Sequence, residues 1–133
     1  MSLQKSILIV EDEAGPRESL RMILKPFYEI HTASSGEEAI RIFQTKDFGV
    51  VTLDLNMPGM TGIDVLKELK KMKPEVEAVI ITALATLPNA QKAIHYGASD
   101  FLSKPFHVSE VIGVIKKSFE RLESKPHTAG PAK

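Results

Sequence analysis

The sequence predicts a doubly wound α/β sandwich of five strand–helix units, (βα)5, in which helices cover both faces of a five-stranded parallel sheet. Short apolar runs alternate with longer segments of helical periodicity along the chain. Successive runs are roughly 21–29 residues apart, which is enough chain for the right-handed crossover that two parallel strands require. A chain of 133 residues is long enough for one such domain and too short for two.

The first strand is expected at residues 7–10, because four consecutive apolar residues suit a strand that is covered on both faces. A helix follows and stops at Pro26, which cannot continue it; its apolar side consists of Leu20, Ile23 and Leu24. Residues 28–32 predict the second strand. Ser35 and Glu38 then predict a capping box at the start of a helix whose buried residues are Ala39, Ile40 and Phe43.

The third strand is expected at residues 50–53 and the fourth at 79–81, and the helix between them follows a loop with Pro58, Gly59 and Gly62. The apolar residues of that helix are Val65, Leu66, Leu69 and Met72. Residues 88–96 predict a helix that ends at Gly97, and residues 100–103 the fifth strand. The last helix has the clearest apolar stripe, made of Val108, Val111, Ile112, Ile115, Phe119 and Leu122. Because the stripe ends there, residues 1–123 are expected to form the domain and residues 124–133 a linker or disordered tail.

The composition excludes several classes of protein. With 43% hydrophobic and 26% charged residues, the chain is neither disordered nor of low complexity. Seventeen basic and seventeen acidic residues cancel, so overall charge does not favour nucleic acid or an anionic membrane as a partner. The absence of cysteine excludes disulfides, thiolate metal sites and cysteine nucleophiles. No apolar run reaches membrane-spanning length and no signal-peptide pattern is present, so a cytoplasmic location is expected.

Polar side chains follow the predicted strands where each strand ends. Glu11 and Asp12 come directly after the first strand, Asp54 after the third, Thr82 at the end of the fourth and Lys104 after the fifth. Ligands of open parallel sheets bind outside these carboxyl ends, so these side chains are expected to share one crevice. Crowded carboxylates favour a bound cation, and oxygen ligands suit Mg²⁺. A lysine and a hydroxyl beside them suit the oxygens of a phosphoryl group carried on a carboxylate.

Each of these residues also fits an ordinary structural role. Residues 11–13 fit a solvated helix N-terminus, where the helix dipole favours acidic side chains. Asp54 fits a turn or cap residue, Thr82 a β-branched strand residue, and Lys104 a surface lysine before a turn proline. Their occurrence together at one end of one sheet favours a shared site over separate local roles.

Four motifs extend this pattern, namely residues 7–13 (ILIVEDE), 54–62 (DLNMPGMTG), 80–83 (IITA) and 97–106 (GASDFLSKPF). In this order and spacing they resemble the CheY-like receiver domain of two-component response regulators, from Lys5 to about Glu123. One such motif would be a weak signal, whereas four in register are a strong one. The resemblance implies a flavodoxin-like fold with strand order 2-1-3-4-5.

The resemblance also implies a role for each residue of the site. Asp54 would accept a phosphoryl group from the phosphohistidine of a histidine kinase or phosphotransfer protein. Asp12 and Asp54 would bind Mg²⁺ through carboxylates, Asn56 through its main-chain carbonyl, and Glu11 through metal-bound water. On this basis the chain is a signalling domain that assists only its own phosphorylation and dephosphorylation, and not an enzyme.

The remaining implied roles concern the phosphoryl group and the switch. Thr82 would hydrogen-bond the phosphoryl group and Lys104 would pair with it, aimed by a cis peptide bond before Pro105. On phosphorylation, Thr82 would move and Phe101 rotate inward, changing the face formed by the fourth helix, fifth strand and fifth helix. That face would control an output domain, a partner protein or a second copy of the chain. Phe101 fits the role of an ordinary core aromatic equally well.

Leu84 stands two residues after Thr82, where relatives of this kind often carry polar residues. We expect its apolar side chain to slow loss of the phosphoryl group by hindering an attacking water.

Two other function classes compete with this interpretation. A Mg²⁺-dependent phosphohydrolase that works through an aspartyl-phosphate needs a second Asp two positions after its nucleophile as general acid, and the chain has Asn56 there. A phosphorylation-independent, receiver-like protein-binding module would not need Asp12, Asp54, Thr82 and Lys104 together. Binding of Mg²⁺ distinguishes a working receiver from such a module, since the module is expected to lack it.

Overall fold

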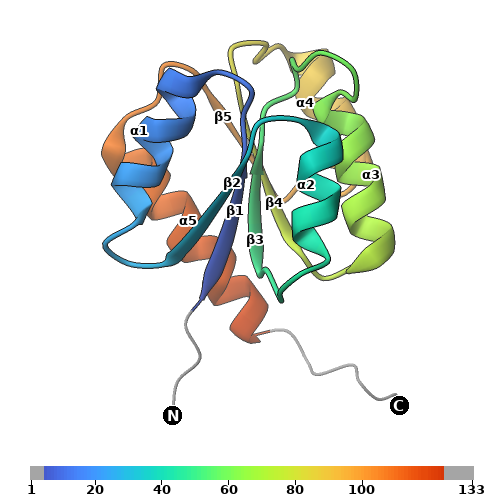
Figure 1. Ribbon diagram of the computed structural model, residues 1–133. Helices are drawn as coiled ribbons and strands as arrows, with labels where there is room; N and C mark the ends of the chain where they lie inside the picture. Colours follow the sequence, from blue (N-terminus) through green and yellow to red (C-terminus); the bar gives the residue numbers. More distant parts are fainter. Residues whose placement is uncertain (1–4, 125–133) are drawn as a thin grey trace.

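The structure is a computed structural model that describes residues 5–124. Within these residues five strands and five helices alternate along the chain (Figure 1). Their bounds are β1 Ser6–Val10, α1 Ala14–Leu24, β2 Glu29–Ala33, α2 Gly36–Phe43, β3 Val50–Leu53, α3 Gly62–Met72, β4 Glu77–Thr82, α4 Leu87–His95, β5 Asp100–Ser103 and α5 Val108–Ser124.

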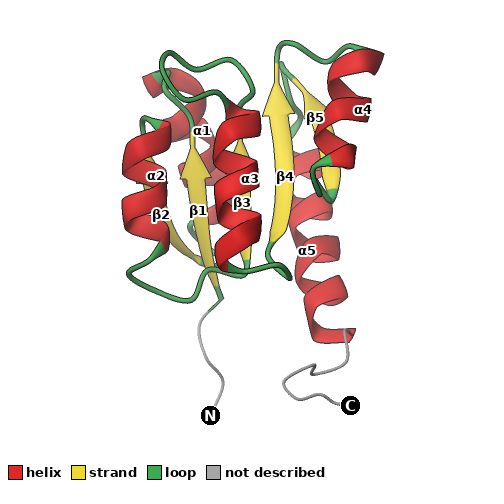
Figure 2. Cartoon of the chain, turned by 90° about the vertical axis from the view of Figure 1, so that its right-hand side faces the viewer, coloured by secondary structure: helices red, strands yellow, loops and turns green. Residues whose placement is uncertain are grey.

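The five strands form one parallel sheet in the order β2-β1-β3-β4-β5, which confirms the predicted topology. Helices α1 and α5 cover one face of the sheet, and α2, α3 and α4 cover the other (Figures 1 and 2). The chain moves outward from β1 to β2 and then returns past β1 to β3, so the direction of winding reverses between β1 and β3. Val10 and Leu53, the last residues of β1 and β3, are paired in the sheet, so the loops after these two strands start at the same edge.

Side chains of successive strand residues point to opposite faces, and the sheet therefore supports two apolar cores. Leu8, Val10 and Val51 contribute to the core beneath α2 and α3, whereas Ile7, Ile9 and Val50 contribute to the core beneath α1 and α5. All five residues of β1 are buried, as the continuous apolar run predicts for a central strand with both faces covered. This two-sided burial holds the end of β1 rigidly where its polar residues begin.

Three sequence-based predictions of local detail are wrong. Met72 and Val108 keep the helical spacing of buried residues, but they lie at the end of α3 and the start of α5 and are 38% and 55% exposed. The Ser35 hydroxyl accepts a hydrogen bond from the Glu38 amide, but the Glu38 carboxylate accepts from the Ser34 amide, so no reciprocal capping box forms at α2. The reciprocal pair lies at α3, between Thr61 and Asp64.

Helix α5 continues through Ser124, the residue at which the sequence predicts a linker or tail to begin. The rest of that segment, residues 125–133, lies outside the described residues. Among the helices of residues 5–124, none combines the length and apolar character needed to cross a membrane.

Candidate functional site

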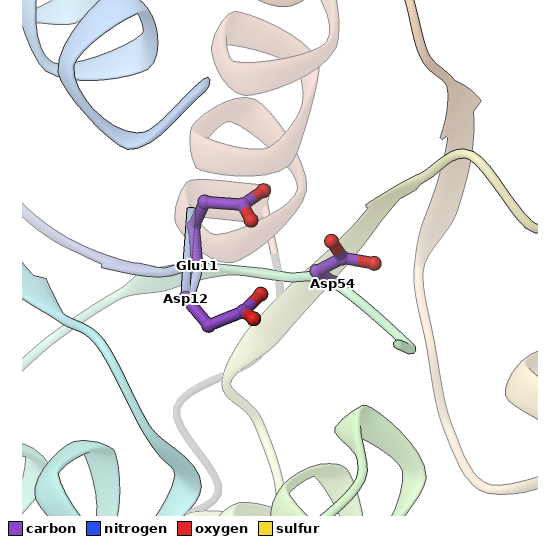
Figure 3. Close-up of side chains that lie close together, drawn as sticks. All are labelled: Glu11, Asp12 and Asp54. Carbon is purple, nitrogen blue, oxygen red and sulfur yellow. The ribbon is translucent and has the colours of Figure 1, made fainter. Parts of the chain in front are cut away.

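Three carboxylates meet at the edge of the sheet where β1 and β3 end. Glu11 and Asp12 follow β1, and Asp54 follows β3. One oxygen from each of the three lies within 4.8 Å of the others, and Figure 3 shows the three groups facing a common space. The structure therefore brings together the acidic residues that the sequence predicts to share a crevice. Glu11 and Asp54 are buried, while Asp12 is half-buried.

The ammonium group of Lys104 lies between two of these carboxylates. Its Nζ is 2.7 Å from Asp54 Oδ2 and 2.6 Å from Glu11 Oε1, with Glu13 Oε1 at 3.9 Å. Lys104 follows β5, and the Lys104–Pro105 peptide bond is cis, as expected. The side chain is only 12% exposed, so the ion pairs are largely shielded from water. One positive charge thus balances part of the negative charge of the cluster.

Asp54 is held in its ionised form by its hydrogen bonds. Burial raises the pKa of the Asp54 carboxyl, but hydrogen bonds from Lys104, the Asn56 amide and the Thr82 hydroxyl outweigh it, and the net pKa is lowered. The main-chain amide of Asn56 donates to Asp54 Oδ1 at 3.0 Å and Lys104 donates to Oδ2, so both carboxylate oxygens accept a hydrogen bond. The result is an anionic oxygen nucleophile in a fixed orientation.

Glu11 has the opposite electrostatic balance. Burial raises the pKa of the Glu11 carboxyl above its ordinary value, against the lowering effects of Lys104 and the Glu13 amide, and the charge of Asp54 adds to the rise. Ionised Glu11 therefore has a higher free energy here than in water. A divalent cation beside Glu11, Asp12 and Asp54 would stabilise the ionised form of Glu11.

Thr82 and Phe101 lie in β4 and β5, the two strands beyond β3 in the sheet. Thr82 ends β4 and is fully buried, and its hydroxyl accepts a hydrogen bond from the Leu84 amide at 3.1 Å. Phe101, in β5, is half-buried and packs against the core beneath α2 and α3. Leu84 lies in the loop after β4 and is 42% exposed.

The family profile of the response regulator receiver domain matches residues 7–116, which contain every residue of this cluster. The chain belongs to this family. A receiver domain is a module of two-component signalling and not a classical enzyme, and the acidic cluster of Glu11, Asp12 and Asp54 is consistent with the phosphorylation site of such a domain.

Comparisons with individual proteins agree with this family membership. The receiver domain is 32% identical over 122 residues to the cell cycle response regulator CtrA of Brucella ovis, a match that covers 91% of this chain and 52% of CtrA. The chain thus spans about half the length of the curated relatives it matches. A receiver domain protein from Clostridium thermocellum is 32% identical, with a TM-score of 0.84 and coverage of 90% of this chain and 97% of that one. A CheY-like receiver domain protein from Methanospirillum hungatei is 26% identical, with a TM-score of 0.89 and coverage of 93% and 100%.

Receiver domains bind Mg²⁺ at an acidic pocket, and the residues present here suit that ion. Mg²⁺ takes oxygen ligands and is commonly held by one or two carboxylates together with water and phosphate oxygens. Asp12 and Asp54 offer such carboxylates from adjacent strand ends, and Glu11 adds a third nearby. The donor set therefore fits a hard divalent cation.

Gly62 is a residue of the site that the sequence pattern places only in a loop. A Cβ atom at this position would lie 2.2 Å from the Asp54 carbonyl oxygen and 2.8 Å from Leu55 Cα. The first turn of α3 thus packs directly against the main chain of Asp54, and only glycine leaves room for it. No local pattern in the sequence marks this contact, because it depends on how α3 lies over the end of β3.

Proposed function

We propose that the chain accepts a phosphoryl group on Asp54 from the phosphohistidine of a histidine kinase or phosphotransfer protein. In this proposal Mg²⁺ assists the transfer, and the modified domain changes its α4–β5–α5 face to control an output domain or partner protein. The observation that carries the proposal is the ionised, buried Asp54 carboxylate held between Lys104 and two further carboxylates.

The geometry of the site favours Asp54 as the acceptor. Its carboxylate accepts hydrogen bonds from both the Lys104 ammonium and the main-chain amide of Asn56, which fix its orientation. Its pKa is lowered, so the carboxylate is ionised, whereas burial raises the pKa of Glu11. In the proposed reaction, a carboxylate oxygen of Asp54 attacks phosphorus, the bond from phosphorus to the histidine nitrogen breaks, and its electron pair stays on the imidazole.

The other residues of the site are proposed to balance the added charge. Lys104 pairs with Asp54 at present, and the same ammonium is in position to pair with oxygens of a phosphoryl group on that carboxylate. The buried Thr82 hydroxyl supplies a second donor. Asp12 and Asp54 would hold Mg²⁺ through carboxylates, Asn56 through its main-chain carbonyl and Glu11 through water. When bound, the ion supplies positive charge to the phosphoryl oxygens during transfer.

The proposed switch starts at Thr82, whose hydroxyl now accepts from the Leu84 amide. A phosphoryl group on Asp54 offers the proton of that hydroxyl new anionic acceptors in place of the Asp54 carboxylate, to which it now donates. Movement of Thr82 would alter the loop that leads into α4 and the space available to Phe101. Phe101 is half-buried in β5, which pairs with β4, and this position on the strand next to Thr82 supports its role as the second moving part.

The domain bounds are proposed on the same grounds. Residues 1–123 would form the receiver domain and residues 124–133 a linker or tail, because Leu122 is the last apolar residue of α5 that packs against the core.

The test is the intact mass of the protein after incubation with Mg²⁺ and acetyl phosphate. We expect the wild type to gain one phosphoryl group that hydroxylamine removes, as it does from an acyl phosphate. Asp54→Asn and a sample with the metal chelated should gain none. Asp47→Asn makes the same chemical change at a carboxylate with a 90% exposed side chain before β3, and it should react like the wild type.

Other outcomes would point to the competing functions. If the wild type gains no phosphoryl group and binds neither Mg²⁺ nor beryllofluoride, the chain is a phosphorylation-independent binding module. Rapid release of phosphate over many turnovers from a range of phosphate monoesters would indicate a phosphohydrolase instead, although Asn56 offers no general acid for that reaction.

A further inference from the structure

Arg17 reaches from the first turn of α1 back to the main chain of residues 11–13, the acidic loop between β1 and α1. Its Nη1 donates to the carbonyl oxygen of Glu11 at 3.0 Å and to that of Asp12 at 3.3 Å. These two residues carry two of the three clustered carboxylates. Arg17 is half-buried, and within residues 5–124 its side chain makes no hydrogen bond or ion pair with any of the three carboxylates. Its contact with the site is therefore through the backbone.

Helix stability does not account for a cation at this position. The positive end of the helix dipole lies at the first turn and disfavours Arg there. No acidic residue occupies that turn of α1, and the N-cap residue Glu13 makes no side-chain capping hydrogen bond. The hydrogen bonds that the Arg17 side chain makes within residues 5–124 are the two to the loop.

The Asp12 carbonyl lies outside the hydrogen-bond pattern of α1. It belongs to the residue before the N-cap Glu13, whose backbone is extended rather than helical. The Arg17 amide bonds the next carbonyl, that of Glu13, and the Arg17 side chain supplies the donor for Asp12. On the other side of the loop, the Glu11 amide is held by the Ala33 carbonyl at 3.0 Å. Arg17 thus fixes the part of the loop that the sheet does not.

We propose that Arg17 is a positioning residue for the cation site, which holds the main chain of Glu11 and Asp12 so that their carboxylates face Asp54. This inference rests on the proposed binding of Mg²⁺ to that cluster. It concerns an outer residue that sets the geometry of ligands without being one, and loss of such residues typically weakens metal binding by about 10- to 100-fold.

A role of Arg17 through its charge and a role through its position predict opposite effects of Arg17→Gln on Mg²⁺ binding. If Arg17 acted only through its charge, removing a cation from the surroundings of three carboxylates would strengthen Mg²⁺ binding. If Arg17 acts by position, removing it loosens the loop and weakens binding despite the gain in attraction. Arg17→Gln removes both the charge and the guanidinium group. Arg17→Lys keeps the charge and loses the guanidinium Nη1, the one atom that reaches both carbonyls.

The experiment measures the dissociation constant for Mg²⁺ by titration calorimetry on the full chain of 133 residues. We expect Arg17→Gln to bind about tenfold more weakly than the wild type, and Arg17→Lys to bind more weakly than the wild type as well. Arg21→Gln is the matched control, since Arg21 lies one turn further along α1 and pairs with the exposed Glu18. It should bind Mg²⁺ like the wild type.

A second measurement is made without metal, so that it reports position directly. The Glu13 amide donates to Glu11 Oε2 at 3.1 Å, and its hydrogen exchange should be faster in both Arg17 variants and unchanged in Arg21→Gln. Circular dichroism establishes that each variant is folded, and Arg17→Lys decides the question if Arg17→Gln does not fold.

Unchanged binding in Arg17→Lys together with tighter binding in Arg17→Gln would overturn the positioning role and leave the site intact. Absence of Mg²⁺ binding in the wild type would instead overturn the proposed function, and the positioning role with it.

Discussion

Gly62→Ala is the substitution for which the structure makes the sharpest prediction. Gly62 begins α3, and its amide donates to the Leu55 carbonyl at 3.3 Å. An added Cβ would meet the Asp54 carbonyl oxygen at 2.2 Å and the Asp54 carbonyl carbon at 2.9 Å. All the nearest atoms belong to the backbone, so no flexible side chain can move aside. The methyl group therefore displaces either α3 or the main chain of the proposed phosphoryl acceptor.

The size of the effect follows from the contact distance. Ordinary van der Waals contact begins at 3.4 Å, so the two segments must separate by about 1 Å. Overpacking of this kind costs about 1–3 kcal/mol of unfolding free energy. Misplacing a reacting group by about 1 Å slows the reaction by up to about 100-fold. We therefore expect Gly62→Ala to lower both the stability and the rate of phosphorylation by acetyl phosphate.

Gly113→Ala is the matched control. Gly113 lies within α5, and a Cβ there would meet nothing within 4 Å. The same chemical change should therefore raise the unfolding free energy by about 0.5–1 kcal/mol, through the higher helix propensity of alanine. Urea unfolding followed by circular dichroism gives the free energies, and intact mass against time gives the phosphorylation rates. A Gly62→Ala variant that is as stable and as reactive as the wild type would refute the reasoning.

The site and its surroundings support four further predictions. Lys104→Met leaves Glu11 and Asp54 facing each other, so the unfolding free energy without metal should fall by about 3 kcal/mol at pH 7. The loss should become smaller as the pH falls through the raised pKa of Glu11, because that carboxyl then binds a proton; a loss that does not change with pH would contradict this. The lowered pKa of Asp54 stabilises the folded state above its unfolded-state value, and this stability is lost as the pH falls through the folded value. In urea unfolding between pH 7 and pH 3, the wild type should therefore lose stability relative to Asp54→Asn as the pH falls. The buried Thr52 hydroxyl has no hydrogen-bond partner among the described residues, so Thr52→Val should leave stability unchanged or raise it by about 1 kcal/mol in the same assay. Leu84→Glu should shorten the half-life of the phosphorylated protein, followed by intact mass, and an equal half-life would exclude a shielding role for Leu84.

Part of the candidate site could be predicted from local patterns in the sequence. Residues 7–10 and the acids after them could be predicted, because an apolar run that ends abruptly in charge is typical of a central strand that is buried on both faces. The convergence of Glu11, Asp12 and Asp54 could also be predicted, given the rule that parallel strands end at one edge of the sheet. Both inferences depend on periodicity and chain order, which a linear sequence contains.

Other features escaped prediction because they are set by contacts between distant segments. Met72 and Val108 match the apolar spacing of their helices, yet both are exposed because they lie at helix ends, where neighbouring elements cover them only in part. Ser35 and Glu38 do not form the capping box predicted at α2, because the Glu38 carboxylate accepts from the Ser34 amide instead. A capping box is present at α3, between Thr61 and Asp64, where none was predicted. Propensity rules state what a residue can do locally, and competing partners decide among the possibilities.

The amino-acid sequence was sufficient to predict the fold class, the strand order expected from the family resemblance, and the set of acidic, hydroxyl and ammonium groups at one edge of the sheet. Four features needed the assembled fold, namely the pairing of Lys104 with both Glu11 and Asp54, the opposite pKa shifts of those two acids, the contact of Gly62 with Asp54, and the hold of Arg17 on the acidic loop. Burial, hydrogen bonding and close packing depend on distances between segments that are far apart in the chain, and these distances exist only once the sheet and its helices have assembled.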